Sequence, residues 1–424
     1  MKTYFFVFCA MVMAFPGLCF SGAVFRDSEI ENVVKQLSAP LFNVANVDID
    51  AVRVFIVDDD TVNAYVTPEN YVFIHRGLLR FSKSPDVMVG VIAHEIGHMA
   101  QHHVVKRERE RRSVALAESL GRVLGMVASV IVDPKVGSAI MAGSSTISQR
   151  NFLAYSRTQE EVADQLALEY LDAAGYSHDG LSQVLRHFKQ REAQYTYIDE
   201  YVSSHPLSEQ RLIKMNSYKK KQAVVGFKEE DKASFARIVE KTEAFLVPID
   251  LLKNRELSPY MKAIVDSRNA NLQESLSQLG ELIDAAPNDP YLREIRAQIL
   301  YKLGEIDACI VDYKVALNGL PDDVLIKLQL AQAMVIKDPG AALPYLEQVS
   351  RRERDNPFVW QQLALAYGRT GQIGMSYFAL ANRHFFEGNK KKFLEYIKLS
   401  KRHFGKDSAQ LQVMADLEEV YATR

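Results

Sequence analysis

The run VIAHEIGHMAQHH, residues 91–103, places four histidines and a glutamate in an otherwise apolar stretch. If this run is an α-helix, His94 and His98 lie one turn apart on one face, about 6 Å along the axis. Two imidazoles at that separation can converge on one metal ion. The spacing therefore predicts a helix that carries half of a metal site. The alternative is a buried helix whose histidines are satisfied by the core.

Glu95 lies beside the two histidines, so the motif reads His94-Glu95-x-x-His98, the H-E-x-x-H pattern of zinc peptidases. A catalytic zinc usually has three protein ligands and one open position. The metzincin extension of the motif is excluded, because Gln101 and Val104 stand where glycine and histidine would be needed. We therefore expect the third ligand on another helix.

The helix expected to begin near Thr158 offers several carboxylates. On a helical wheel Glu160 lies about 70° from the centre of the apolar arc, Asp164 about 110° and Glu161 about 170°. A carboxylate that borders a core is costly unless it is paired or bound to metal. The wheel therefore selects Glu160 as ligand and Asp164 as its neighbour. The residues taken as the buried arc are Val162, Ala163, Leu166, Ala167, Tyr170 and Leu171.

The rest of the first half predicts a small sheet and a secreted chain. Residues 1–23 have the apolar run and small final residues of a signal peptide, and their removal leaves Cys309 as the one cysteine.

Residues 53–57 and 71–75 predict strands, with a third between them. The strand near 71–75 is expected at a sheet edge, where an extended peptide could add to it. Residues 114–132 predict either a buried helix or a segment lying on a membrane surface.

The second half predicts helical hairpins in series. Pro287, Pro321 and Pro357 are 34 and 36 residues apart, and the segments between them resemble the tetratricopeptide repeat. An unrelated helical bundle is the alternative. The expected organisation is a signal peptide (1–23), an α+β zincin-like metallopeptidase domain with a small β-sheet (24–217), a linker and connecting helix (218–254) and an all-α tetratricopeptide-repeat solenoid (255–424). The chain as a whole is then mainly α.

H-E-x-x-H followed by Glu160-x-x-x-Asp164 resembles the gluzincin metallopeptidases that include HtpX and the CAAX prenyl endopeptidases. The signal peptide and the repeats narrow this resemblance to the periplasmic branch, the beta-barrel assembly-enhancing proteases. The resemblance implies His94, His98 and Glu160 as ligands of one Zn²⁺ per chain. Glu95 would then be the general base and Asp164 a proton donor. Gln165 departs from the family, whose members carry arginine there, so we expect Asp164 to lack a charged neighbour.

Two further residues are candidates for the catalytic centre. His205 and Arg211, in SSHPLSEQR, resemble the family's His-Pro…Arg segment and could stabilise the oxyanion that develops during hydrolysis. His205 could instead occupy the open position of the zinc and keep the enzyme latent.

The expected function is zinc-dependent endoproteolysis of misfolded or misassembled outer-membrane proteins in the periplasm. The repeats would bind these clients or their assembly machinery, since stacked repeats offer a protein-binding surface. The alternative is a chaperone or adaptor with a largely latent protease site. A net charge of −2 gives no reason to expect nucleic acid as a partner. Peripheral membrane contact stays open, through residues 114–132.

Overall fold

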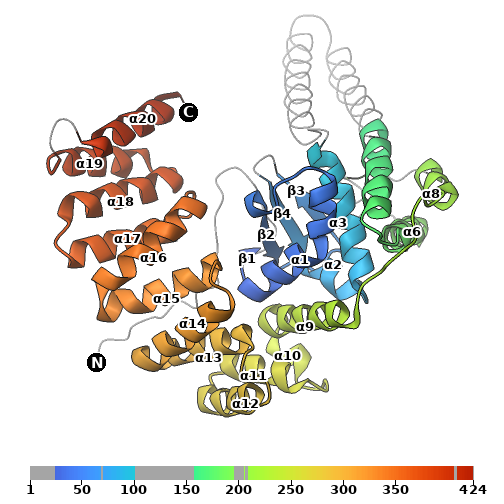
Figure 1. Cartoon of the computed structure of the whole chain (residues 1–424), viewed down its shortest axis with the longest axis horizontal. Helices are drawn as coiled ribbons and strands as arrows, with labels where there is room; N and C mark the ends of the chain where they lie inside the picture. Colours follow the sequence, from blue (N-terminus) through green and yellow to red (C-terminus); the bar gives the residue numbers. More distant parts are fainter. Residues whose placement is uncertain are drawn as a thin grey trace, which may run out of the picture. The chain divides into compact units, whose positions relative to one another are not determined.

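The computed structural model describes residues 24–67, 70–100, 157–194, 205, 209–404 and 408–423 (Figure 1). Contacts divide the chain into two compact units, and the main division falls between Glu243 and Ala244. The domain boundaries expected from the sequence stay predictions. Residues 1–23 and 114–132, the expected signal peptide and the apolar segment, lie outside the described residues.

The first unit contains a four-stranded sheet in the order β1-β2-β4-β3. The strands are β1 (Val24–Phe25), β2 (Arg53–Val57), β3 (Ala64–Val66) and β4 (Tyr71–His75). β2 and β4 are parallel, whereas β1 and β3 run antiparallel to their neighbours. The three strands expected between residues 53 and 75 are confirmed.

The expectation that the strand at 71–75 forms a sheet edge is wrong. β4 lies inside the sheet, with β2 on one side and β3 on the other. Four of its five residues are buried, as is usual for a strand covered on both faces. The edge strands are β1 and β3, and β3 packs against the helix that carries the histidine motif.

That helix, α3 (Pro85–Ala100), packs against α6 (Asp179–Gln194) as well as β3. It is apolar around most of its circumference, and such a helix becomes buried in a core. Seven apolar side chains of α3 are at most 2% exposed. The other helices of this unit are α1 (Ser28–Val44), α2 (Arg76–Phe81), a helix over residues 157–173, α8 (Glu209–Ser217) and α9 (Glu229–Leu246), with a 3₁₀ turn η1 (Ile49–Ala51).

The second unit is a series of antiparallel helical hairpins (Figure 1). Asp289, Asp323 and Asn356 cap the first helices of three successive hairpins, and each side chain accepts a hydrogen bond from the backbone of the following turn. The all-helical repeat region is confirmed. The helices are α10 (Ile249–Leu252), α11 (Pro259–Arg268), α12 (Leu272–Ala285), α13 (Pro290–Leu303), α14 (Ile306–Gly319), α15 (Val324–Lys337), α16 (Pro339–Arg352), α17 (Pro357–Arg369), α18 (Ile373–Phe386), α19 (Lys390–Lys401) and α20 (Ala409–Thr423).

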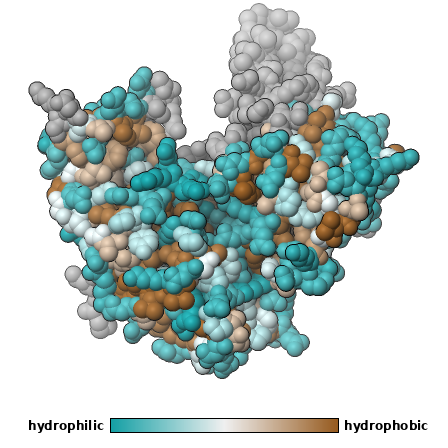
Figure 2. Space-filling model, viewed as in Figure 1, coloured by the Kyte–Doolittle hydropathy of each residue, from teal (hydrophilic) through white to brown (hydrophobic). Residues whose placement is uncertain are grey.

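The surface of the described residues is mixed in character. Figure 2 shows hydrophilic residues over much of the viewed face, with separate brown patches between them. None of the described helices has the length and apolar character needed to cross a membrane.

Candidate metal centre

α3 supplies the first three side chains of the site. His94, Glu95 and His98 are all buried, and their spacing places the two imidazole rings 4.7 Å apart between centroids. Gly97 explains how a second helix can come close to this one. A Cβ atom at Gly97 would lie 2.8 Å from the backbone oxygen of Ala163, so only glycine lets the two helices approach this far.

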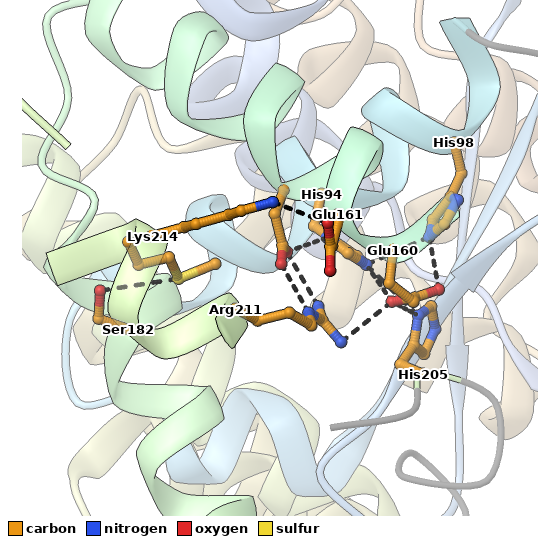
Figure 3. Close-up of polar contacts among 10 residues, drawn as sticks. His94, His98, Glu160, Glu161, Ser182, His205, Arg211 and Lys214 are labelled. Atoms are coloured by element: carbon orange, nitrogen blue, oxygen red, sulfur yellow. Dashed lines mark hydrogen bonds and ion pairs between the residues drawn. The ribbon is translucent and has the colours of Figure 1, made fainter. Parts of the chain in front are cut away.

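The helix over residues 157–173 brings Glu160 to the histidines. Its Oε2 lies 3.1 Å from His94 Nε2, and its Oε1 lies 3.3 Å from His98 Nε2. Glu160 is fully buried, whereas the neighbouring Glu161 points outward and pairs with Lys214 at 2.7 Å. Figure 3 shows Glu160 beside the imidazoles of His98 and His205, and a dashed line from Glu161 to Lys214.

His205 lies in the same cluster, although it follows Glu160 by 45 residues. Its Nδ1 is 3.0 Å from Glu160 Oε2 and 3.3 Å from His94 Nε2. Its Nε2 is 3.6 Å from Glu95 Oε1. His205 thus contacts both the expected metal ligands and the expected general base.

Asp164 and Arg211 form a buried ion pair beside this cluster. Arg211, on α8, binds both oxygens of Asp164 through two nitrogens, at 2.6 and 2.9 Å. The other face of Asp164 meets His94, whose Nδ1 lies 2.9 Å from Asp164 Oδ1. Asp164 therefore has the charged neighbour that we did not expect from Gln165: it comes from α8 instead of the next residue.

These contacts show what surrounds Asp164 and Arg211, whose expected catalytic roles stay predictions. Arg211 is 1% exposed and its guanidinium group binds carboxylates, which argues against the role of oxyanion donor. Asp164 Oδ1 lies within ion-pair distance of His94 Nδ1, the ring nitrogen through which a carboxylate commonly orients a metal-binding histidine. Burial works to raise the pKa of Asp164, but Arg211 and His94 hold it below its usual range.

The negative charge of Glu160 and the imidazole rings around it shift one another's pKa values. Burial works against ionisation of Glu160, yet the histidines hold its pKa well below the usual range. Burial lowers the pKa of His98 to about 3, so this imidazole is neutral and able to ligate a metal. For His94 burial opposes protonation, but Asp164 and Glu160 outweigh it and raise the pKa to about 9, so this imidazole carries a proton in the metal-free site and must lose it to bind a metal. Positive charge is therefore favoured at the centre of the cluster.

The donor set fits a zinc ion. One atom each from His94, His98, Glu160 and His205 lies within 4.8 Å of the others, and all four residues are buried. Imidazole nitrogens and a carboxylate oxygen are common zinc ligands. Among the residues that the structure describes, no other set of histidine, cysteine, aspartate and glutamate side chains gathers in this way.

The buried face of the helix over residues 157–173 differs from the one drawn on the wheel. Val162, placed in the apolar arc, is 38% exposed, whereas Glu160 and Asp164 lie within the buried face and not at its border. The arc was centred on apolar residues, but this helix buries its carboxylates because histidine and arginine partners face them.

Comparisons with known proteins agree with this site. Residues 25–219 match the model of peptidase family M48. The chain is 22% identical to the beta-barrel assembly-enhancing protease of Yersinia pestis over 335 residues, which cover 75% of this chain and 68% of that protein. It is 21% identical to the protein of that name from Escherichia coli K12, over 82% of this chain and 73% of the relative. The mitochondrial metalloendopeptidase OMA1 of Schizosaccharomyces pombe is 26% identical over 38% of this chain and 45% of its own length.

Proposed function

We propose that this chain, which carries a peptidase family M48 domain in residues 25–219, is a zinc endopeptidase acting on misfolded or misassembled outer-membrane proteins. The observation that carries the chemistry is the buried convergence of His94, His98 and Glu160, with Glu95 next to the first histidine. The substrate class rests on the names of the relatives, which are beta-barrel assembly-enhancing proteases.

His94, His98 and Glu160 would hold the zinc, which when bound supplies Lewis-acid activation of water and of the scissile carbonyl. Glu95 would accept a proton from the attacking water and deliver it to the leaving amine. Asp164 would keep the ring of His94 in a fixed orientation through its Nδ1. An extended client would add to the outer edge of β3, because β3 is an edge strand that packs against α3.

Digestion of an unfolded outer-membrane β-barrel protein tests this proposal. The full chain should cleave it, cleavage should stop when a chelator removes the metal, and added Zn²⁺ should restore it. Metal-independent cleavage, or none by the zinc-loaded chain, would reject the proposal. The second candidate, a chaperone or adaptor with a latent site, is favoured by the position of His205 among the ligands. It predicts that Glu95→Gln still promotes assembly of the barrel.

The repeat helices are proposed to bind the client or its assembly machinery. Deleting residues 255–424 should leave hydrolysis of a short peptide nearly unchanged and impair cleavage of the large barrel substrate. None of the proposed catalytic groups lies in the deleted residues, and stacked repeats offer an extended binding surface. Circular dichroism checks that the shortened chain is folded. A folded form that is inert on the short peptide would contradict this division of labour.

His205 is proposed to keep the site latent as a fourth ligand. Its Nδ1 is as close to Glu160 as the nitrogen of His94 is, which supports ligation. His205→Ala should raise kcat on a short peptide, with zinc still near one equivalent, because the position for water is opened. The opposing role, stabilising the oxyanion, predicts a fall in kcat of about 10²–10³-fold. The sign of the change in kcat decides between the two roles.

A further inference from the structure

We propose that Arg211 is a positioning residue that fixes the two carboxylates of the metal centre, Glu160 and Asp164. The inference rests on the proposed zinc-peptidase function and assigns to Arg211 a task that requires no contact with substrate.

The guanidinium group of Arg211 uses all three of its nitrogens on these carboxylates. Nε and Nη2 bind the two oxygens of Asp164, at 2.6 and 2.9 Å. Nη1 lies 3.2 Å from Glu160 Oε2. Figure 3 shows Arg211 extending from its helix toward Glu160. A planar fork held at three points cannot rotate without breaking at least one contact.

The same carboxylates lie against both nitrogens of His94. Asp164 Oδ1 accepts a contact from Arg211 and lies 2.9 Å from His94 Nδ1. Glu160 Oε2 lies 3.1 Å from His94 Nε2. Fixing the two acids therefore fixes the imidazole ring between them. Two proposed zinc ligands, Glu160 directly and His94 through Asp164, depend on one arginine.

Charge explains why this position needs an arginine. Glu160 and Asp164 are one helical turn apart, and both are at least 95% shielded from solvent. Two carboxylates buried this deeply repel each other, and a cation that lies against both offsets this repulsion. The single ammonium of a lysine could supply the charge but could not bind three oxygens in one plane.

A matched control lies one turn further along α8. Lys214 pairs with Glu161 at 2.7 Å, so it joins the same two helices as Arg211 does. This pair is partly exposed, with 61% of the Lys214 side chain accessible, and it does not touch the cluster. Loss of such a pair changes little. Lys214→Gln therefore removes a helix-to-helix contact and leaves the carboxylates of the centre in place.

The experiment measures the Kd for Zn²⁺ of the full chain by competition with a chromophoric chelator. Arg211→Lys and Arg211→Gln should each weaken zinc binding by about 10–100-fold, the usual effect of losing a residue that orients metal ligands. Lys214→Gln should stay within about twofold of the wild type, in line with the small effect of exposed pairs. The absorption spectrum of the Co²⁺-loaded chain should change in the Arg211 variants alone. A folded Arg211→Lys variant with wild-type Kd and spectrum would overturn the inference, since charge alone would then suffice.

A double-mutant cycle with Asp164→Asn tests whether Arg211 acts through Asp164. Arg211→Gln should change the Kd for Zn²⁺ less in the Asp164→Asn background than in the wild type. Equal effects in both backgrounds would overturn the inference. If Arg211→Gln alone does not fold, the Arg211→Lys comparison decides, because it keeps the buried charge.

The two proposals can fail separately. A wild-type chain that binds no Zn²⁺ would reject the proposed function, and the inference with it. A wild-type chain that binds Zn²⁺ as tightly as its Arg211 variants would reject the inference and leave the function standing.

Discussion

Replacing Glu95 by glutamine is expected to lower kcat for hydrolysis of a short peptide by about 10²–10⁴-fold, the usual contribution of a general base. Glutamine has nearly the same shape as glutamate but cannot accept the proton of the attacking water. Glu95 is 2% exposed, and its Oε1 lies 3.6 Å from His205 Nε2, so its position depends on packing that the substitution preserves.

Two measurements separate loss of chemistry from loss of the site. Zinc content and the melting temperature of Glu95→Gln should match those of the wild type, whereas kcat should not. Glu161→Gln serves as the control, because it makes the same chemical change on the outward side of the neighbouring helix. A variant of Glu95 that keeps more than a tenth of wild-type kcat would show that another group accepts the proton.

The strand and helix elements near the motif could be predicted from local pattern. Arg53–Val57 and Tyr71–His75 are short apolar runs with the β-branched and aromatic residues that strands favour, and both form strands with the expected bounds. The order of the strands could not be predicted in this way. Position in a sheet depends on pairing between distant segments, and a run that is buried on both faces fits an interior strand better than an edge.

The spacing of the prolines indicates the repeat period, but the spacing of the residues that cap the helices is more regular. Pro321 lies in a turn, whereas Pro357 begins α17, so the proline spacing of 36 residues mixes two structural positions. The capping residues Asp289, Asp323 and Asn356 are equivalent positions, and their spacing follows the hairpins themselves. A cap is set by the local backbone, which makes it the better marker of a repeat boundary.

For the candidate site, the spacing of residues in the sequence predicts which side chains share a face of one helix. It does not predict which side chains from different helices meet. The four-residue interval from His94 to His98 predicts a shared face, and the helical wheel separates Glu160 from Glu161. The wheel could not reveal that Arg211 lies against Asp164, because α8 is 47 residues further along the chain. It also misplaced the buried face, since an apolar average gives no weight to acids that have buried partners.

Glu160→Gln is expected to cost more than about 100-fold in zinc affinity, beyond the usual effect of losing a residue that merely orients a ligand. An amide oxygen carries no charge, and Glu160 contacts both His94 and His98. Glu161→Gln changes the adjacent residue and should have no such effect, because Glu161 pairs with Lys214 at the surface. Any general weakening of the helix would affect both variants alike.

The most direct test of the metal centre is therefore metal analysis by atomic absorption on the purified wild type, Glu160→Gln and Glu161→Gln. After dialysis against a weak chelator, the wild type and Glu161→Gln should each retain about one zinc per chain, the number expected for a catalytic site. Glu160→Gln should retain almost none. Equal zinc in the two variants, or loss in Glu161→Gln alone, would contradict the assignment of Glu160 as a ligand.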